Sequence, residues 1–209
     1  MNKKIKAIIF DLGGVLYDID LRRSTKAFGD LGLKNFDKLY SLKEQTAVFD
    51  NLEEGKIGRT EFLKHLRRYL PQTSQNESIL DAWRALLVDF PQKNIDILQK
   101  IRATHKIYLL SNTNEIHLEA INKYLQQHRG IQDIRDLFDK AFFSFEIGLR
   151  KPGEEVFKYV LKDIGLKGDE CLFVDDSEAN VRGAEKAGIT SIYKVKSEAL
   201  LPVLTPYLS

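Results

Sequence analysis

The chain repeats one pattern, in which a short run of apolar residues stops abruptly at polar ones. Runs of this kind, rich in β-branched and aromatic residues, are typical of strands buried on both faces of a sheet. The sequence predicts five such strands, at Ala7–Phe10, Ile107–Leu110, Ala141–Phe145, Cys171–Val174 and Ile189–Tyr193. Helices are predicted between the later strands, at residues 94–103, 115–127, 152–164 and 177–187. Because strands that alternate with helices form parallel sheets with right-handed crossovers, we predict an α/β fold.

Residues 20–90 break this alternation, since no strand is predicted in them. Apolar residues at three- and four-residue spacing predict four short helices instead, at Ser24–Leu31, Phe36–Phe49, Thr60–Leu70 and Ser78–Leu87. We therefore expect two domains: residues 1–19 and 91–209 form a Rossmann-like parallel sheet with helices on both faces, and residues 20–90 form an all-helical cap, a four-helix bundle. Trp83 is assigned to the core of that bundle. Because the insertion follows the first strand, it should cover the sheet edge where ligands bind.

Polar side chains of different chemical kinds follow three of the predicted strands. Asp11 follows the first, Ser111 and Asn112 follow the second, and Asp175-Asp176 follow the fourth. In a parallel sheet these strand ends share one edge, so the side chains should converge there. Carboxylate oxygens are suitable ligands for Mg²⁺. A phosphate is bound well by a hydroxyl group, backbone N–H groups and a lysine acting together. The lysine that we expect to join them is Lys151.

Composition narrows the choice of partners. The 209 residues include 32 basic and 30 acidic ones, and 43% are hydrophobic, which does not favour a nucleic-acid partner. Cys171 is the single cysteine and the four histidines follow no zinc-ligand spacing, so we expect no disulfide and place the histidines at the surface. No stretch approaches the roughly 20 apolar residues of a membrane span. A soluble cytoplasmic protein without a membrane partner is expected, and its oligomeric state is left open.

Four stretches resemble the motifs of the haloacid dehalogenase (HAD) superfamily of hydrolases. They occur in the family's order and span nearly the whole chain: Phe10–Leu16, Leu109–Asn112, Arg150–Pro152 and Phe173–Ser177. The helical insertion resembles the family's cap between the first and second motifs. The opening Asp-Leu-Gly and the Leu-Ser-Asn-Thr-Asn stretch look most like the branch that contains a bacterial α-glucose-1-phosphate phosphatase.

This resemblance implies an Mg²⁺-dependent phosphatase that acts on a small phosphorylated metabolite, such as a sugar phosphate. Asp11 would be the nucleophile and would form an aspartyl phosphate. Its other oxygen, the backbone carbonyl of Gly13 and Asp176 would bind Mg²⁺. Asp175 would lie beyond the direct metal ligands or orient Lys151, although the two neighbouring acids could exchange roles.

The same resemblance assigns the phosphate-binding groups. Ser111 and the N–H of Asn112 would hold phosphate oxygens, and Lys151 would offset the negative charge shared by the nucleophile and the phosphate. Together with the metal, the lysine would let an anionic carboxylate approach an anionic phosphate.

One position departs from the family pattern. Most phosphatases of the family carry a second aspartate two residues after the nucleophile, which protonates the leaving oxygen, and here that residue is Gly13. A leaving group that needs little protonation, such as the anomeric oxygen of a sugar 1-phosphate, would fit this change, and Asp18 or Asp20 could replace the acid unless they serve a turn or a cap. Two alternatives follow: a carbon–halogen hydrolase, which needs no such acid but generally lacks the pair Asp175-Asp176, and a non-catalytic protein that binds phosphorylated metabolites.

Overall fold

One parallel sheet organises the molecule. A computed structural model of the chain describes residues 5–34, 36, 40, 47–195 and 198–208. Five strands pair in the order β5-β4-β1-β6-β7, and every neighbouring pair is parallel. In chain order they are β1 (Ala7–Phe10), β4 (Lys106–Ser111), β5 (Lys140–Phe143), β6 (Cys171–Asp175) and β7 (Thr190–Tyr193). The predicted fold class is confirmed.

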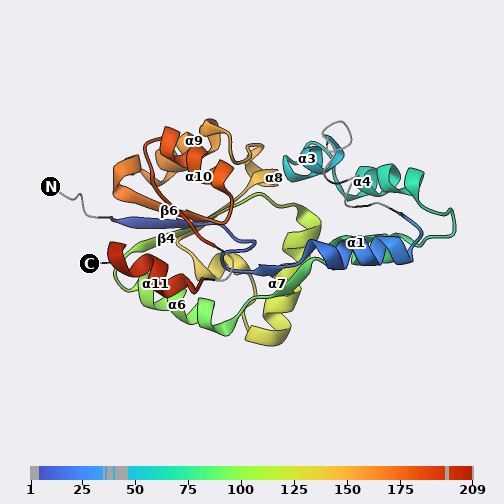
Figure 1. Cartoon of the computed structure of the whole chain (residues 1–209), viewed down its shortest axis with the longest axis horizontal. Helices are drawn as coiled ribbons and strands as arrows, with labels where there is room; N and C mark the ends of the chain where they lie inside the picture. Colours follow the sequence, from blue (N-terminus) through green and yellow to red (C-terminus); the bar gives the residue numbers. More distant parts are fainter. Residues whose placement is uncertain (1–4, 35, 37–39, 41–46, 196–197, 209) are drawn as a thin grey trace.

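Helices cover both faces of this sheet. Side chains alternate across β1, so that Ile8 and Phe10 belong to one hydrophobic cluster while Ala7 and Ile9 belong to another. All of β1 is fully buried. The first cluster packs against α6 (Gln92–Arg102), α7 (Glu115–Arg129) and α11 (Leu200–Leu204), and the second against α9 (Glu154–Ile164) and α10 (Glu178–Lys186), as Figure 1 shows. A strand at the centre of the sheet is buried on both faces, so its sequence is apolar at every position, as that of β1 is.

The inserted residues form a separate helical unit, which we call the cap segment and which projects beyond the carboxyl ends of the strands (Figure 1). Its own hydrophobic cluster surrounds Trp83 and includes Phe28, Phe49 and Phe62. The predicted helix Phe36–Phe49 lies mostly outside the described residues. The described helices of the segment are α1 (Leu21–Asp30), α3 (Ala47–Glu53), α4 (Arg59–Leu66), the 3₁₀ helix η1 (Arg67–Tyr69) and α5 (Asn76–Arg84). The limits of the two predicted domains stay a prediction.

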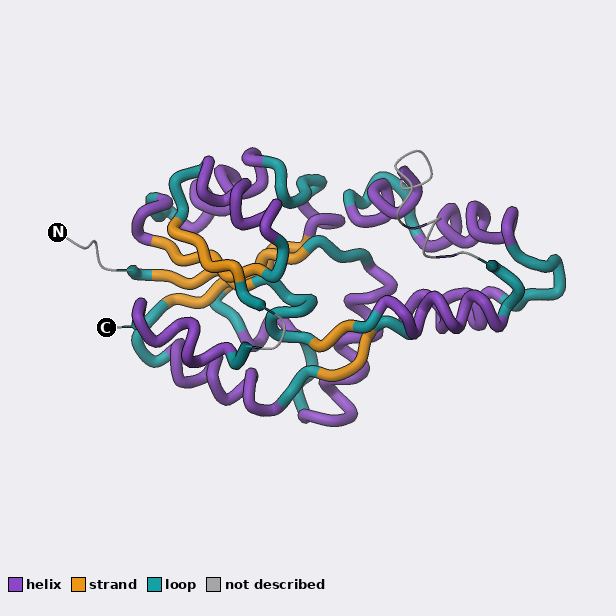
Figure 2. The backbone as a smooth tube through the Cα atoms, viewed as in Figure 1, coloured by secondary structure: helices purple, strands orange, loops and turns teal. Residues whose placement is uncertain are grey.

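The expectation that the cap segment is all-helical is wrong at its end. Strand β3 (Leu87–Asp89) pairs antiparallel with β2 (Asp18–Ile19), and Figure 2 shows the pair where the chain enters and leaves the segment. The partners are about 70 residues apart in the chain, and neither strand carries a periodic pattern of its own, so only tertiary pairing creates them. The pair brings the two connections to the cap segment together beside the sheet edge.

Short helices make up the remaining connections. The predicted strand Ala141–Phe145 ends at Phe143, because the next residues turn into a helix. The short connecting helices are α8 (Ser144–Ile147), η2 (Ile134–Leu137), η3 (Gly168–Glu170) and η4 (Thr205–Tyr207). Within the described part of the chain, no helix is both long and apolar enough to cross a membrane.

Candidate active site

A buried lysine joins two of the predicted acids. The Nζ of Lys151 lies 2.6 Å from Asp11 Oδ1 and 2.7 Å from Asp175 Oδ2. Asp11 directly follows β1 and donates its backbone N–H to Val174 of the neighbouring β6, at whose end Asp175 lies. The side chain of Lys151 is only 1% exposed. Parallel register thus brings acids that are 164 residues apart (175 − 11) to one cation, as the sequence predicted.

The electrostatics of the cluster depend on that cation. Burial raises the pKa of Asp11 to about 7, because the charged form loses its water, and Lys151 pulls the pKa in the opposite direction. Burial also acts to lower the pKa of Lys151, but the carboxylates of Asp11 and Asp175 outweigh it and the pKa is raised. Lys151 is therefore charged at neutral pH. A further cation beside Asp11 would favour its ionised form.

Asp176 completes a group of three acids. One carboxylate oxygen from each of Asp11, Asp175 and Asp176 lies within 4.8 Å of the others. Two oxygens on opposite sides of one Mg²⁺ are about 4.2 Å apart, so the spacing is close to what a single ion needs. Burial, followed by the charge of Asp175, raises the pKa of Asp176. Three hard oxygen donors with an excess of negative charge over Lys151 fit a divalent cation.

Gly14 lets the backbone approach this group closely. Its φ of +78° lies in the left-handed region, and an added Cβ would lie 1.9 Å from Asp176 Oδ2. Any side chain there would displace the Asp176 carboxylate. Lys194 Nζ donates to the Gly14 carbonyl across 3.4 Å and holds the turn on its other side.

Hydrogen bonds distinguish Asp175 from its neighbour. Oδ1 of Asp175 accepts from the Ser177 backbone N–H at 2.8 Å, and Asn180 Nδ2 lies 3.0 Å from both oxygens. With Lys151 on Oδ2, both oxygens of Asp175 are engaged. Among the described residues, no other side chain donates a hydrogen bond to the Asp176 carboxylate. Asp176 is thus the freer of the two acids, and Asn180 is a contributor that the sequence did not identify.

The predicted phosphate-binding residues lie beside the cluster. Ser111 ends β4 and is buried. Asn112 and Lys151 bind each other reciprocally: Asn112 Nδ2 donates to the Lys151 carbonyl at 2.9 Å, and the Lys151 N–H donates to Asn112 Oδ1 at 3.0 Å. The side chain of Asn112 therefore positions the backbone of the lysine, in addition to the N–H role predicted for this residue.

A cavity of about 290 Å³ separates the sheet edge from the cap segment. Gly13, Ser111 and Asn112 line it from the sheet side, and Glu53 and Trp83 line it from the cap side. Most of its other walls are apolar. The volume is just below the roughly 300–1,000 Å³ typical of ligand pockets, which fits a small molecule.

Ile19 occupies the space next to Gly13. A Cβ added at Gly13 would lie 3.1 Å from Ile19 Cδ1, and Ile19 also lines the cavity. Of the two residues suggested as replacements for the missing acid, Asp18 is exposed, and Asp20 caps α1 by accepting from the Arg22 N–H at 3.1 Å. An apolar side chain thus lies directly beside the position where a side chain at residue 13 would begin.

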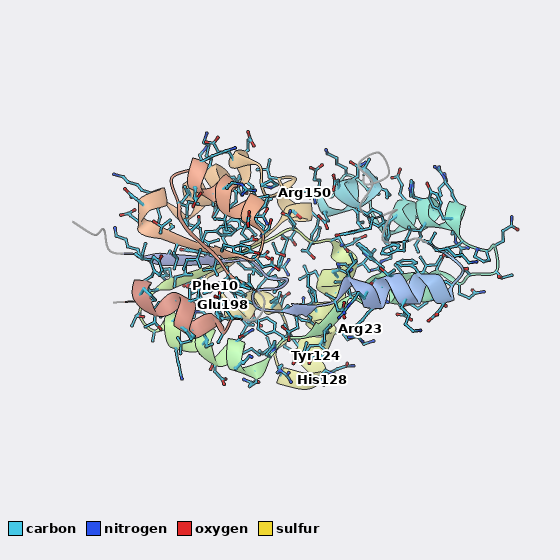
Figure 3. The ribbon with its side chains drawn as sticks, viewed as in Figure 1. Phe10, Arg23, Tyr124, His128, Arg150 and Glu198 are labelled. Carbon is cyan, nitrogen blue, oxygen red and sulfur yellow. The ribbon has the colours of Figure 1, made fainter. Side chains whose placement is uncertain are left out.

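Arg150 fastens the cap segment beside the lysine. Its Nη1 lies 2.6 Å from Asp50 and its Nη2 lies 2.6 Å from Glu53, both on α3, and Figure 3 shows Arg150 at the junction of the two parts. Close by, Gly55 has a φ of +67°, and a Cβ there would lie 2.1 Å from the Phe145 carbonyl oxygen. Arg150 was predicted only as part of a motif, and its position immediately before Lys151 is the sequence signal that could have identified it.

The surface assignment of the histidines is wrong for two of them. His105 and His117 are buried. His117 stacks on Trp83 at 4.6 Å between ring centroids, and its Nε2 lies 3.1 Å from the Trp83 carbonyl oxygen. The cap segment covers this face of α7, so the burial of His117 is a tertiary effect that helical periodicity does not report.

The burial of His117 makes stability depend on pH. Burial lowers its pKa to about 4, below the 6.5 of an exposed histidine, so the unfolded chain binds more protons between these values. We expect this histidine to cost about 2 kcal/mol of unfolding free energy between pH 7 and pH 5. In urea unfolding, His117→Gln should lose less stability than the wild type over this range. His128→Gln, at an exposed site, is the matched control, and an unchanged pH dependence in His117→Gln would contradict the prediction.

A parallel sheet that carries three acids and a buried lysine at its carboxyl edge, beneath a helical cap, defines a capped α/β hydrolase. The model of the haloacid dehalogenase-like hydrolase family matches residues 5–188. The chain therefore belongs to the haloacid dehalogenase-like hydrolases, which confirms the family resemblance of its four motifs.

Several relatives match nearly the whole chain. D-ribitol-5-phosphate phosphatase of Bacteroides thetaiotaomicron is 33% identical over 184 residues, which cover 88% of this chain and 89% of the relative. A HAD family enzyme of the same species, solved in complex with magnesium and inorganic phosphate, has a TM-score of 0.86 and 34% identity, with 93% and 96% of the two chains covered. A predicted HAD-like family hydrolase from Porphyromonas gingivalis has a TM-score of 0.89 and 30% identity, with 99% and 98% covered.

Proposed function

We propose that this chain is an Mg²⁺-dependent phosphatase that hydrolyses a small sugar or polyol phosphate through an aspartyl phosphate on Asp11. The relative named D-ribitol-5-phosphate phosphatase, together with family membership, supports a phosphoric monoester hydrolase. The observation that carries the mechanism is the contact of Lys151 with both Asp11 and Asp175, with Asp176 close by. The relative named for D-ribitol 5-phosphate supports the substrate class. A screen of sugar, polyol and nucleotide phosphates tests it, and release of phosphate from none of them would refute it.

Each residue of the site has a step in this reaction. The Asp11 carboxylate attacks phosphorus, the bond to the ester oxygen breaks, and the departing alkoxide takes a proton from water or from the substrate. Water then attacks the aspartyl phosphate, which releases inorganic phosphate and regenerates Asp11. Ser111 and the Asn112 N–H hold phosphate oxygens, while Lys151 stabilises the negative charge that nucleophile and phosphate share.

The proposed metal site uses Asp11, the Gly13 carbonyl and Asp176. Asp175 is assigned to orient Lys151, because its oxygens are already bound by that lysine, Ser177 and Asn180. When bound, Mg²⁺ supplies positive charge that offsets the repulsion between carboxylate and phosphate.

Removal of the metal separates this function from carbon–halogen hydrolysis. We expect EDTA to lower phosphate release at least about 100-fold, because several kcal/mol of charge stabilisation are lost, and excess Mg²⁺ should restore it. Phosphate release is measured with a colorimetric assay. Chloride release from a 2-chloro acid that persists in EDTA would contradict the proposal and favour the dehalogenase alternative. Binding of Mg²⁺ and phosphate without turnover of any phosphate ester would favour the non-catalytic one.

Gly13 has no acidic side chain, and this bears on which alcohol can act as the leaving group. The hypothesis of a sugar 1-phosphate stays a prediction, and the relative named for a 5-phosphate points instead to a primary alcohol as the leaving group. Because residue 13 is a glycine, it cannot supply the proton, which comes from water, the substrate or another side chain.

A further inference from the structure

The hydroxyl group of Ser144 holds the loop that follows β4. Its Oγ accepts a hydrogen bond from the Thr113 N–H at 3.0 Å and donates one to the Thr113 carbonyl oxygen at 3.1 Å. Ser144 is fully buried, and Thr113 is 5% exposed. Within the described residues, no other group binds this N–H or this carbonyl oxygen, so both depend on the serine for their pairing.

The register of the sheet places Ser144 beside this loop. Ser111, the last residue of β4, pairs with Phe143, the last residue of β5. Because the two strands are parallel, the residues that follow them leave the sheet at the same edge. The residue after one strand thus anchors the loop after the other, immediately beyond the last pair of the sheet.

The anchored loop carries the groups assigned to the phosphate. The Thr113 N–H and the Asn112 carbonyl belong to one planar peptide unit, so a hydrogen bond to that N–H fixes the backbone orientation at Asn112. The Asn112 side chain is itself bound to the Lys151 backbone. Within the described residues, the Asn112 N–H and the Ser111 hydroxyl have no hydrogen-bond partner, and both residues line the cavity. These two donors are therefore available to a phosphate oxygen.

We propose that Ser144 is a positioning residue for phosphate binding, whose hydroxyl group holds the loop so that the Asn112 N–H and the Ser111 hydroxyl face the phosphate. Ser144 does not line the cavity, so it acts through the loop and not on the substrate. Donors that the fold already holds in place bind an anion more tightly than mobile ones, because less conformational freedom is lost on binding. This inference rests on the proposed phosphatase function.

Titration calorimetry with inorganic phosphate at saturating Mg²⁺ tests the inference without requiring turnover. Ser144→Ala removes both hydrogen bonds to Thr113, and we expect its dissociation constant for phosphate to rise at least about 10-fold. Ser24→Ala is the matched control, because Ser24 is also fully buried and its hydroxyl donates to the Trp83 carbonyl oxygen at 3.2 Å. This variant should also lose stability in thermal unfolding, but it should bind phosphate as tightly as the wild type.

Steady-state kinetics give a second readout, with the ester that the wild type hydrolyses fastest in the substrate screen. Ser144→Ala should lower kcat/KM at least about 10-fold, mostly through a higher KM, since the same donors hold the phosphate before and during the reaction. Ser144→Cys nearly keeps the volume of serine but forms only weak hydrogen bonds. It should fold even where Ser144→Ala does not, and it should weaken phosphate binding in the same direction.

The outcomes separate this inference from the function on which it rests. If the Ser144 variants bind phosphate as tightly as the wild type, the positioning role is refuted while the phosphatase function stands. An equal loss of phosphate affinity in Ser24→Ala would also refute that role, because the loss would then follow from removing any buried hydroxyl. If the wild type binds phosphate but hydrolyses no ester, the proposed function fails, and the titration still decides the role of Ser144. Absence of phosphate binding in the wild type would refute the phosphate site and that role together.

Discussion

Asp11→Asn should lower kcat for phosphate release by at least about 10⁴-fold, because a neutral amide cannot attack phosphorus. Asparagine has nearly the shape of aspartate, and the site is 8% exposed, so we expect the packing around β1 to survive. Steady-state kinetics at saturating Mg²⁺ measure the loss, and circular dichroism with thermal unfolding checks the fold.

The control for this variant is Asp18→Asn. Asp18 is an exposed acid on β2 that does not line the cavity, and its replacement should leave kcat within about twofold of the wild type, as is usual for a surface change. Turnover that persists in Asp11→Asn would remove the aspartyl phosphate from the mechanism. A large loss in Asp18→Asn would instead reassign an acid role to that residue.

Lys151→Met should impair both activity and stability. Removal of the ammonium group leaves the buried carboxylates of Asp11 and Asp175 without their shared cation, which typically costs roughly 3–5 kcal/mol of unfolding free energy. Loss of one charge-stabilising group at the reacting centre should also lower kcat about 10²–10³-fold. Urea unfolding in EDTA isolates the effect on stability from that of bound metal.

Lys158→Met is the matched control for the lysine. Lys158 forms an ion pair with Glu154 on the exposed surface of α9, and its removal should leave the unfolding midpoint unchanged. If Lys151→Met unfolds at the same urea concentration as the wild type, the two buried ion pairs do not contribute to the free energy of unfolding. Full activity in Lys151→Met would exclude the lysine from the proposed chemistry.

The sequence alone determined the sheet and the acids at its edge. Central parallel strands carry continuous apolar runs, so β1, β4 and β6 are visible as Ala7–Phe10, Ile107–Leu110 and Cys171–Val174 without knowledge of their partners. Their ends mark the positions of Asp11 and Asp175. Since parallel strands align their carboxyl ends, convergence of these residues follows from the fold class alone, and the structure brings them to one lysine.

Only the tertiary structure decided what faces the cavity. The pairing of β2 with β3, the burial of His117 and the approach of Glu53 to Arg150 all join residues that are far apart in the chain. Helical periodicity separates an apolar face from a polar one, but it does not say which neighbour covers that face. Trp83 is an example. Helical periodicity places it in the core of the helical insertion, and the docking of the cap segment also makes it line the cavity.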